Sequence, residues 1–117
     1  MPNYHAALDQ AFRALADPTR RAMVERLARG PASVGELAQP FRMALPSLME
    51  HLRMLENSGL VSTEKVGRVR TCRLEPAPIK QTQAWLSRQR AVWESRIDRL
   101  DDYLAELQGK RKKRWKP

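Results

Sequence analysis

Apolar residues recur along the first quarter of the chain at the spacing of two amphipathic helices. A first helix is expected over residues 6–16, because its apolar residues are separated by four and three positions. These residues are Leu8, Phe12 and Leu15. Asp17 and Pro18 then supply an N-cap and a first-turn proline for a second helix, which is expected to end at Gly30 and Pro31. Its expected buried residues are Met23, Val24 and Leu27.

Two further helices follow with a short link between them. Ser33 and Glu36 have the spacing of a capping box and predict a short helix that ends near Pro40. A fourth helix is expected over residues 45–58, closed by Gly59. Its predicted buried stripe is Leu48, Leu52 and Leu55. Two helices joined so closely have the spacing of a helix-turn-helix, whose second helix enters the DNA major groove.

The second half of the chain predicts a hairpin and one long helix. Strand-like runs over residues 60–66 and 69–74 meet at Gly67, which is a hairpin signal. The basic residues at and near its tip are Lys65, Arg68, Arg70 and Arg73. After residues 76–78 a helix is expected to run to about Gln108. Its apolar residues follow a heptad seam interrupted by Arg90, namely Leu86, Trp93, Ile97, Leu100, Leu104 and Leu107.

This order predicts a mainly α fold with a small β-hairpin (α+β), in the order α-α-α-α-β-β-α of a winged helix-turn-helix. We expect residues 1–108 to form the DNA-binding and dimerisation domain. Residues 109–117 are expected to form a basic disordered tail. The seam of the last helix needs a partner, and self-pairing predicts a two-fold dimer that presents two recognition helices to a palindromic operator.

Charge and composition narrow the function. The 117 residues include 22 Lys and Arg against 13 Asp and Glu, a net charge of +9, which suits a polyanionic partner. Residues 110–117 hold six of these cations and no acid, so the tail accounts for much of the excess. The sequence has no stretch of 18 apolar residues and no apolar run near its N-terminus. We therefore expect no membrane partner, and we expect a cytoplasmic location.

The residues available for catalysis or metal binding are few. Cys72 is the one cysteine, and the two histidines are His5 and His51, whereas zinc usually takes three or four protein ligands. The chain has no glycine-rich phosphate loop and no nucleophile in a motif with histidine. We therefore expect no enzyme activity, no catalytic residues, no metal and no cofactor. Cys72 should face inward as an inert small hydrophobe.

The motifs together resemble the ArsR family of winged-helix bacterial transcription regulators over about residues 8–107. They are residues 14–21 (ALADPTRR), 35–38 (GELA), Leu48 with 51–55 (HLRML), 59–61 (GLV), and Gly67 with Arg68. Residues 93–97 and 100–104 resemble the branch without an obvious metal site. The resemblance implies a homodimeric repressor whose first and last helices form the interface. The implied interface residues are Leu8, Phe12, Leu86, Trp93, Ile97, Leu100, Leu104 and Leu107.

Departures from the family pattern bear on sensing and on DNA reading. Ala38 and Pro40 stand near the positions of the family's sensory cysteines, and the last helix has no histidine, so metal sensing is not expected. Ala44 stands where the family usually has a serine N-cap. Met49 and Glu50 replace a small hydroxyl residue and commonly a basic one, which indicates altered operator preference, with reduced affinity as the alternative.

The expected partner is double-stranded DNA, contacted by two groups of residues. The predicted major-groove residues are Pro46, Ser47, Glu50 and Arg53, and the predicted backbone contacts are Lys65, Arg68 and Arg70. Arg53 could instead pair with Glu50 or Glu56. Arg20 and Arg21 are interpreted as ion-pair donors that stabilise the fold, and His51 as a packed structural histidine.

Two other functions stay open at this point. The tail could drive binding to nucleic acid without sequence preference. Alternatively, a recognition helix that carries Ala44, Met49 and Glu50 could have lost DNA and serve a protein-interaction module. A small apolar effector is a further open partner, and the sequence names none.

Overall fold

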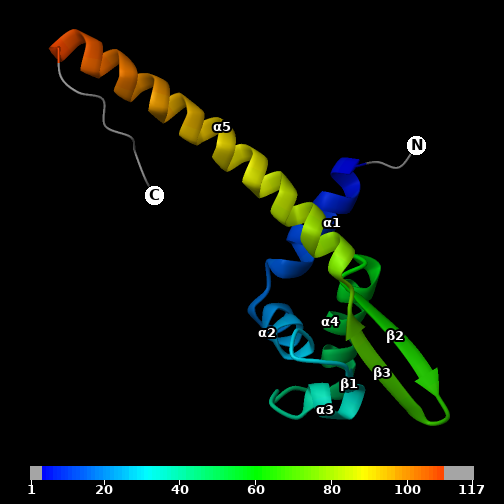
Figure 1. Ribbon diagram of the computed structural model, residues 1–117. Helices are drawn as coiled ribbons and strands as arrows, with labels where there is room; N and C mark the ends of the chain where they lie inside the picture. The colour runs from blue at the N-terminus through cyan, green and yellow to red at the C-terminus, as the bar shows by residue number, and fades with distance from the viewer. Residues whose placement is uncertain (1–3, 110–117) are drawn as a thin grey trace. The chain divides into compact units, whose positions relative to one another are not determined.

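The elements follow the predicted order, with one added strand. The computed structural model describes residues 4–109. The helices are α1 (Tyr4–Leu15), α2 (Pro18–Leu27), α3 (Val34–Ala38), α4 (Leu45–Asn57) and α5 (Pro76–Gln108), and the strands are β1 (Ala32–Ser33), β2 (Val61–Val66) and β3 (Val69–Leu74). The chain divides into two compact units between Thr82 and Gln83. The mainly helical fold with a small antiparallel sheet confirms the predicted class (Figure 1).

Short-range hydrogen bonds begin the helices where the sequence predicts. The Asp17 side chain accepts from the backbone N–H of Arg20 at 3.0 Å, which caps α2. At α3, the Glu36 N–H donates to Ser33 Oγ and the Ser33 N–H donates to Glu36 Oε1, both at 3.1 Å. This confirms the capping box. Gly59 ends the turn after α4 with a φ of +80°, which favours glycine.

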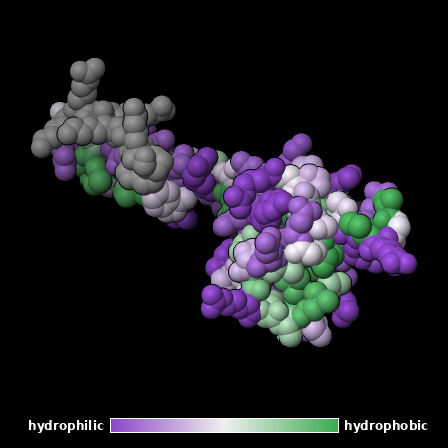
Figure 2. Space-filling model, turned by 90° about the horizontal axis from the view of Figure 1, so that it is seen from below, coloured by the Kyte–Doolittle hydropathy of each residue, from purple (hydrophilic) through white to green (hydrophobic). Residues whose placement is uncertain are grey.

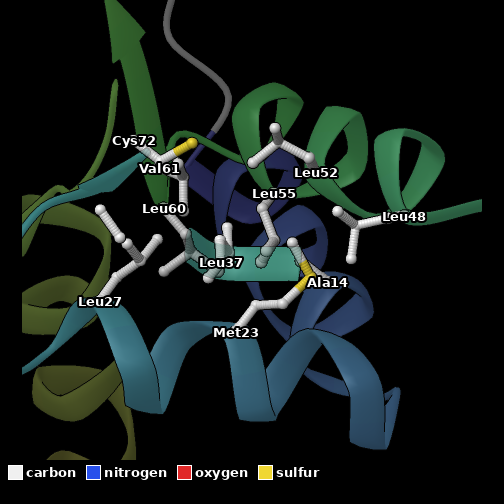
Figure 3. Close-up of a cluster of buried hydrophobic side chains, with 11 residues drawn as sticks. Ala14, Met23, Leu27, Leu37, Leu48, Leu52, Leu55, Leu60, Val61 and Cys72 are labelled. Atoms are coloured by element: carbon white, nitrogen blue, oxygen red, sulfur yellow. The ribbon is translucent and has the colours of Figure 1, made fainter. Parts of the chain in front are cut away.

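The core of the first unit lies between the helices and the sheet. Figure 3 shows side chains from α2, α3, α4 and the sheet pointing toward one another. The predicted stripe of α4 is fully buried, with Leu48, Leu52 and Leu55 each at 1% exposure or less. Met23 and Leu27 of α2 are buried as well. Val24, expected to be buried, is only partly so and packs at the margin.

The sheet has three strands, whereas the sequence predicted a two-stranded hairpin. All pairs are antiparallel in the order β1-β3-β2, and β1 pairs Ala32 with Cys72. A strand of two residues carries no readable alternation, which is why sequence patterning missed it. Gly67 lies between β2 and β3 with a φ of +63°, as the first central position of a type II′ turn requires. We call the β2–β3 hairpin the wing; Figure 1 shows it extending from the helices.

Helix α5 begins earlier than predicted and makes up the described part of the second unit. Pro76 and Pro78 lie in its first turn, where a proline removes no intrahelical hydrogen bond. Its predicted seam is largely open to solvent, with Leu86, Trp93 and Leu100 each about half exposed. Of the helices in residues 4–109, none is both long and apolar enough to cross a membrane. The predicted tail, residues 110–117, lies outside the described residues.

Candidate nucleic-acid interface

Helix α4 presents a polar face opposite its leucine stripe. The four predicted major-groove residues of this face are all exposed: Pro46, Ser47, Glu50 and Arg53. Ala44 has the extended N-cap backbone, with φ −63° and ψ 146°, but no side-chain oxygen to cap the helix. The backbone therefore places the start of α4 correctly without the hydrogen bond that a serine would add.

The wing carries the predicted cations on its outer half. Lys65, Arg68 and Arg70 are all exposed, and Lys65 lies directly opposite Arg70 in the strand register. Like charges directly opposite one another are unfavourable. A polyanion placed against this face would remove that repulsion, so the wing is suited to a phosphate backbone.

A groove lies between the wing, the start of α3 and α4. It has a volume of about 420 Å³ and is bordered by Met49 of α4, by the three predicted wing cations, and by Val69. Its remaining wall is Ser33, Val34 and Gly35. The structure thus places Lys65, Arg68 and Arg70 together, whereas Pro46, Ser47, Glu50 and Arg53 do not border this groove.

Two successive side-chain hydrogen bonds run from β3 through β2 to the recognition helix, and the second of them joins the wing to α4. Arg70 Nη1 donates to Thr63 Oγ1 at 2.8 Å, and Thr63 Oγ1 donates to Glu56 Oε2 at 3.3 Å. Glu56 therefore pairs with the wing. Within residues 4–109, no ion pair joins Arg53 to Glu50 or Glu56. The interpretation of Arg53 as a partner for these glutamates is wrong for this structure, and its guanidinium is left facing solvent.

Arg20 of α2 lies inside the protein, in contact with His51 of the recognition helix. It is 9% exposed, and its Nε and Nη2 donate to the carbonyls of Ala14 and Arg13 at 2.7 and 3.0 Å. The interpretation of Arg20 as an ion-pair donor needs correction, because its partners are mainly backbone oxygens at the end of α1. Arg21 likewise donates to the Leu15 carbonyl at 2.8 Å.

His51 is packed and hydrogen-bonded, as expected for a structural histidine. Its Nδ1 lies 3.2 Å from Arg20 Nη1 and 3.7 Å from Asp17 Oδ2. The hydrogen bond from the Arg20 backbone N–H lowers the pKa of Asp17, and this outweighs the raising effect of burial. The nearby His51 and the Arg20 guanidinium lower it further.

Cys72 lies in the core, as predicted, with none of its surface exposed. Burial raises the pKa of its thiol, and the charge of Glu56 acts in the same direction. The thiol therefore stays protonated and weakly reactive near neutral pH. No group of three or more His, Cys, Asp or Glu side chains in the described part of the chain could hold a metal ion.

Two exposed valines at the wing tip were not singled out by the sequence. Val66 and Val69 flank the turn and are 67% and 52% exposed. Figure 2 shows the tip, at its right, with hydrophobic residues beside strongly hydrophilic ones. Their place on either side of the Gly67–Arg68 turn was a signal available in the sequence, because a strand tip outside the core leaves β-branched side chains uncovered. The tip thus combines apolar surface with the cation of Arg68.

Known proteins resemble this chain in sequence and in fold. A family model described as a helix-turn-helix domain matches residues 15–64, from the end of α1 into β2. The crystal structure of the ArsR family transcriptional regulator RHA00566 is 56% identical to this chain, with a TM-score of 0.76. The alignment covers 81% of this chain and 98% of that one. The chain belongs to the ArsR family of transcriptional regulators.

Two further relatives are named regulators. HTH-type transcriptional regulator Rv2034 of Mycobacterium tuberculosis is 42% identical over 80 residues, which is 68% of this chain and 75% of the relative. Transcriptional repressor SdpR of Bacillus subtilis is 27% identical over 79 residues, which is 68% of this chain and 88% of SdpR. The ArsR-family chain is therefore a DNA-binding transcription regulator with a winged helix-turn-helix fold. ArsR members are regulators rather than enzymes.

Proposed function

We propose that this ArsR-family chain is a homodimeric repressor that binds a palindromic operator in the cytoplasm and senses no metal. The observation that carries the proposal is the pairing of an exposed polar face on α4 with a basic wing that borders a groove beside that helix. SdpR, named a repressor, supports the direction of control. In this proposal the bound dimer represses by blocking RNA polymerase sterically, which requires no activity besides DNA binding.

The two parts of the interface have different tasks in this proposal. Pro46, Ser47, Glu50 and Arg53 would read base edges in the major groove, where Glu50 can accept from a cytosine amino group. Lys65, Arg68 and Arg70 would hold the flanking backbone. Each phosphate contact that is lost should reduce the slope of log affinity against log salt by roughly 0.9.

The dimer is proposed from the exposed apolar side chains of the first and last helices. Phe12 of α1 and Leu104 and Leu107 of α5 are all substantially exposed, and Leu8 and Ile97 are partly so. Exposed apolar residues at heptad spacing mark a surface that binds another helix. A second copy of the chain is the partner that also matches a palindromic operator.

The first experiment is selection of a genomic fragment library by the purified full chain, at about 150 mM salt with competitor DNA. Enrichment of one inverted repeat is the expected result. Uniform, salt-sensitive binding that disappears on deletion of Lys110–Pro117 would favour the tail-driven, sequence-independent function. Binding to no duplex would favour a protein-interaction module, for which the uncapped α4 and its exposed Glu50 are the relevant observations.

Two substitutions then separate base reading from backbone contact. Arg68→Ala should weaken binding to all duplexes alike, because phosphate attraction carries no sequence information. Ser47→Ala should change the preference among operator variants by about 1–3 kcal/mol at the contacted base pair. Competition binding to a panel of single-base-pair operator variants measures both effects. Identical changes across all sequences for both variants would contradict the proposed division of tasks.

A further inference from the structure

His51 lies on the inner edge of the recognition helix, between Glu50 on the exposed face and Leu52 in the core. Its side chain is 24% exposed, so the protein encloses most of the ring. The leucine stripe packs without directional bonds, whereas this imidazole faces two specific groups. Arg20 Nη1 lies 3.2 Å from its Nδ1, and Asp17 Oδ2 lies 3.7 Å from the same atom.

Arg20 is fixed in position before it reaches His51. Its Nε and Nη2 donate to the carbonyls of Ala14 and Arg13 in the last turn of α1. A guanidinium is planar and its donors form a rigid fork, so these two bonds determine where Nη1 points. The nearly complete burial of Arg20 excludes most of the water that would compete for the third bond.

The chemistry of the pair selects one form of the imidazole. A guanidinium has donors only and stays protonated. The 3.2 Å contact is therefore a hydrogen bond when Nδ1 of His51 accepts it, which places the ring hydrogen on Nε2. The other tautomer would turn its N–H toward Asp17 and lose the bond from Arg20.

We propose that His51 is a positioning residue that sets the rotation of α4 about its axis, with Arg20 as its anchor. The inference rests on the proposed function, because its consequence is operator discrimination. Ala44 supplies no side-chain anchor at the start of α4. Near the end of α4, Glu56 accepts a hydrogen bond from Thr63 of the wing. Between these two points, His51 makes a directional contact with Arg20, and it lies next to the proposed base-reading residues.

Rotation of α4 should affect discrimination more than overall attraction. Hydrogen bonds to base edges depend on direction, whereas attraction to phosphates depends mainly on charge and distance. Loss of the His51 contact would therefore weaken preference for the operator while leaving binding to unrelated DNA nearly unchanged.

The first test compares His51→Leu with His51→Asn. Leucine fills similar space but accepts no hydrogen bond, whereas the asparagine Oδ1 can take the place of Nδ1 as acceptor. The measured quantity is the ratio of Kd values for the selected inverted repeat and a shuffled duplex at one salt concentration. We expect leucine to lower the discrimination about tenfold, comparable with one mismatched base pair, and asparagine to restore most of it.

Thermal melting of both variants separates positioning from a purely structural role. A structural role would lower the melting temperature of the leucine variant and leave its discrimination at the wild-type value. That result would overturn the inference, as would an equal loss of discrimination in the two variants.

A second measurement does not involve DNA. Long-range ¹H–¹⁵N NMR spectra of the full chain report which ring nitrogen of His51 carries hydrogen, and the His51→Asn variant distinguishes its signals from those of His5. We expect hydrogen on Nε2 at neutral pH, and hydrogen on Nδ1 would overturn the inference. If the wild-type chain failed to prefer any repeat, the proposed function would fail, while the tautomer would still decide whether the Arg20 contact exists.

Discussion

At the scale of single residues, two neighbouring helices show what one hydroxyl contributes to the recognition motif. Ser33 and Ala44 both have the extended N-cap backbone, but only Ser33 has an oxygen that accepts from the first turn of its helix. The short helix α3 is therefore capped by its side chains, while the longer α4 relies on buried leucines. The helix that carries the proposed base-reading residues thus begins without a side-chain cap.

Ala44→Ser should stabilise the protein, because the backbone at this position already suits an N-cap. The expected gain in the free energy of unfolding is about 0.5–2 kcal/mol, measured by urea denaturation monitored by circular dichroism. Ser33→Ala is the reciprocal control and should lose a similar amount by removing a hydrogen bond that is present. No gain from Ala44→Ser alongside a clear loss from Ser33→Ala would show that α4 gains nothing from a cap.

At the scale of secondary-structure elements, the wing and the recognition helix are linked through Thr63. Its hydroxyl accepts from Arg70 and donates to Glu56, so one side chain connects β3, β2 and α4. Leu48, Leu52 and Leu55 fix the depth of α4 against the core, but these nonpolar contacts do not orient the wing. The hydrogen bonds of the Thr63 hydroxyl are directional, so they orient the wing relative to α4.

Thr63→Val should lower the free energy of unfolding by about 0.5–1.5 kcal/mol, the net value of a typical hydrogen bond. Valine has nearly the same shape and a high β-propensity, so a loss would be due to the hydroxyl. Thr71→Val is the matched control, because the Thr71 hydroxyl makes no hydrogen bond within residues 4–109. Equal effects of the two substitutions in urea denaturation would argue against the link.

Helix capping also gives the fold a dependence on pH. The bond from the Arg20 N–H lowers the pKa of Asp17 in the folded state, below the value of about 3.9 for an unfolded chain. The unfolded chain then binds more protons between these two values, so stability falls as the pH falls. The contribution is complete above the unfolded pKa and is lost as the pH drops through the folded one. Glu36 acts in the same way, because the Ser33 N–H lowers its pKa.

Asp17→Asn should reduce this dependence and leave the part due to Glu36, because asparagine is also a good N-cap but does not titrate. The measurement is the urea midpoint from about pH 7 down to about pH 2.5, which spans the range in which a carboxylate with a lowered pKa titrates. Asp9→Asn is the control, since this exposed carboxylate accepts no hydrogen bond among the described residues. An unchanged acid dependence in Asp17→Asn, with loss of stability at every pH, would limit Asp17 to a role independent of its charge.

How far the sequence predicts each element depends on how near its partners lie along the chain. The Asp17 cap and the capping box of Ser33 involve residues three positions apart, and both were predicted and confirmed. Strand β1 was missed because its partner Cys72 lies 40 positions from Ala32. The contact of Arg20 with His51 spans 31 positions. No local pattern encodes such pairs.

The same distinction between local and long-range contacts separates the predicted from the unpredicted parts of the candidate site. The leucine stripe of α4 predicted which residues would be exposed, because helical periodicity alone decides the opposite face. The groove beside the wing could not be predicted, since it joins Met49 and the start of α3 to a hairpin some twenty or thirty residues further on. The hydrogen bonds of Arg70 and Glu56 with Thr63 join residues only seven positions apart, but they were missed because each one links two different secondary-structure elements.

At the scale of the whole molecule, α5 exposes apolar side chains along much of its length. Leu100, Leu104 and Leu107 are between 43% and 66% exposed. Full burial of an exposed leucine is worth about 1.5–3 kcal/mol, so covering each of these half-exposed side chains would contribute part of that value. Arg96 and Arg99 line a hollow on α5 together with Ile97 and Leu100, and charged residues commonly lie beside the apolar seam of helical interfaces. The proposed second copy of the chain would cover these apolar side chains.

Ile97→Asp should convert the proposed dimer into monomers, because it places a carboxylate in the apolar seam of each copy. Ser95→Asp adds the same charge on the outer side of α5 and should leave the dimer intact. Sedimentation velocity measures the oligomeric state, and binding to the inverted repeat measures the consequence. Since two linked half-sites bind more tightly than one by about 10²–10⁴, the monomer should bind the repeat no better than a half-site. A dimeric Ile97→Asp with full affinity would place the interface away from this seam and leave α1 as its remaining candidate.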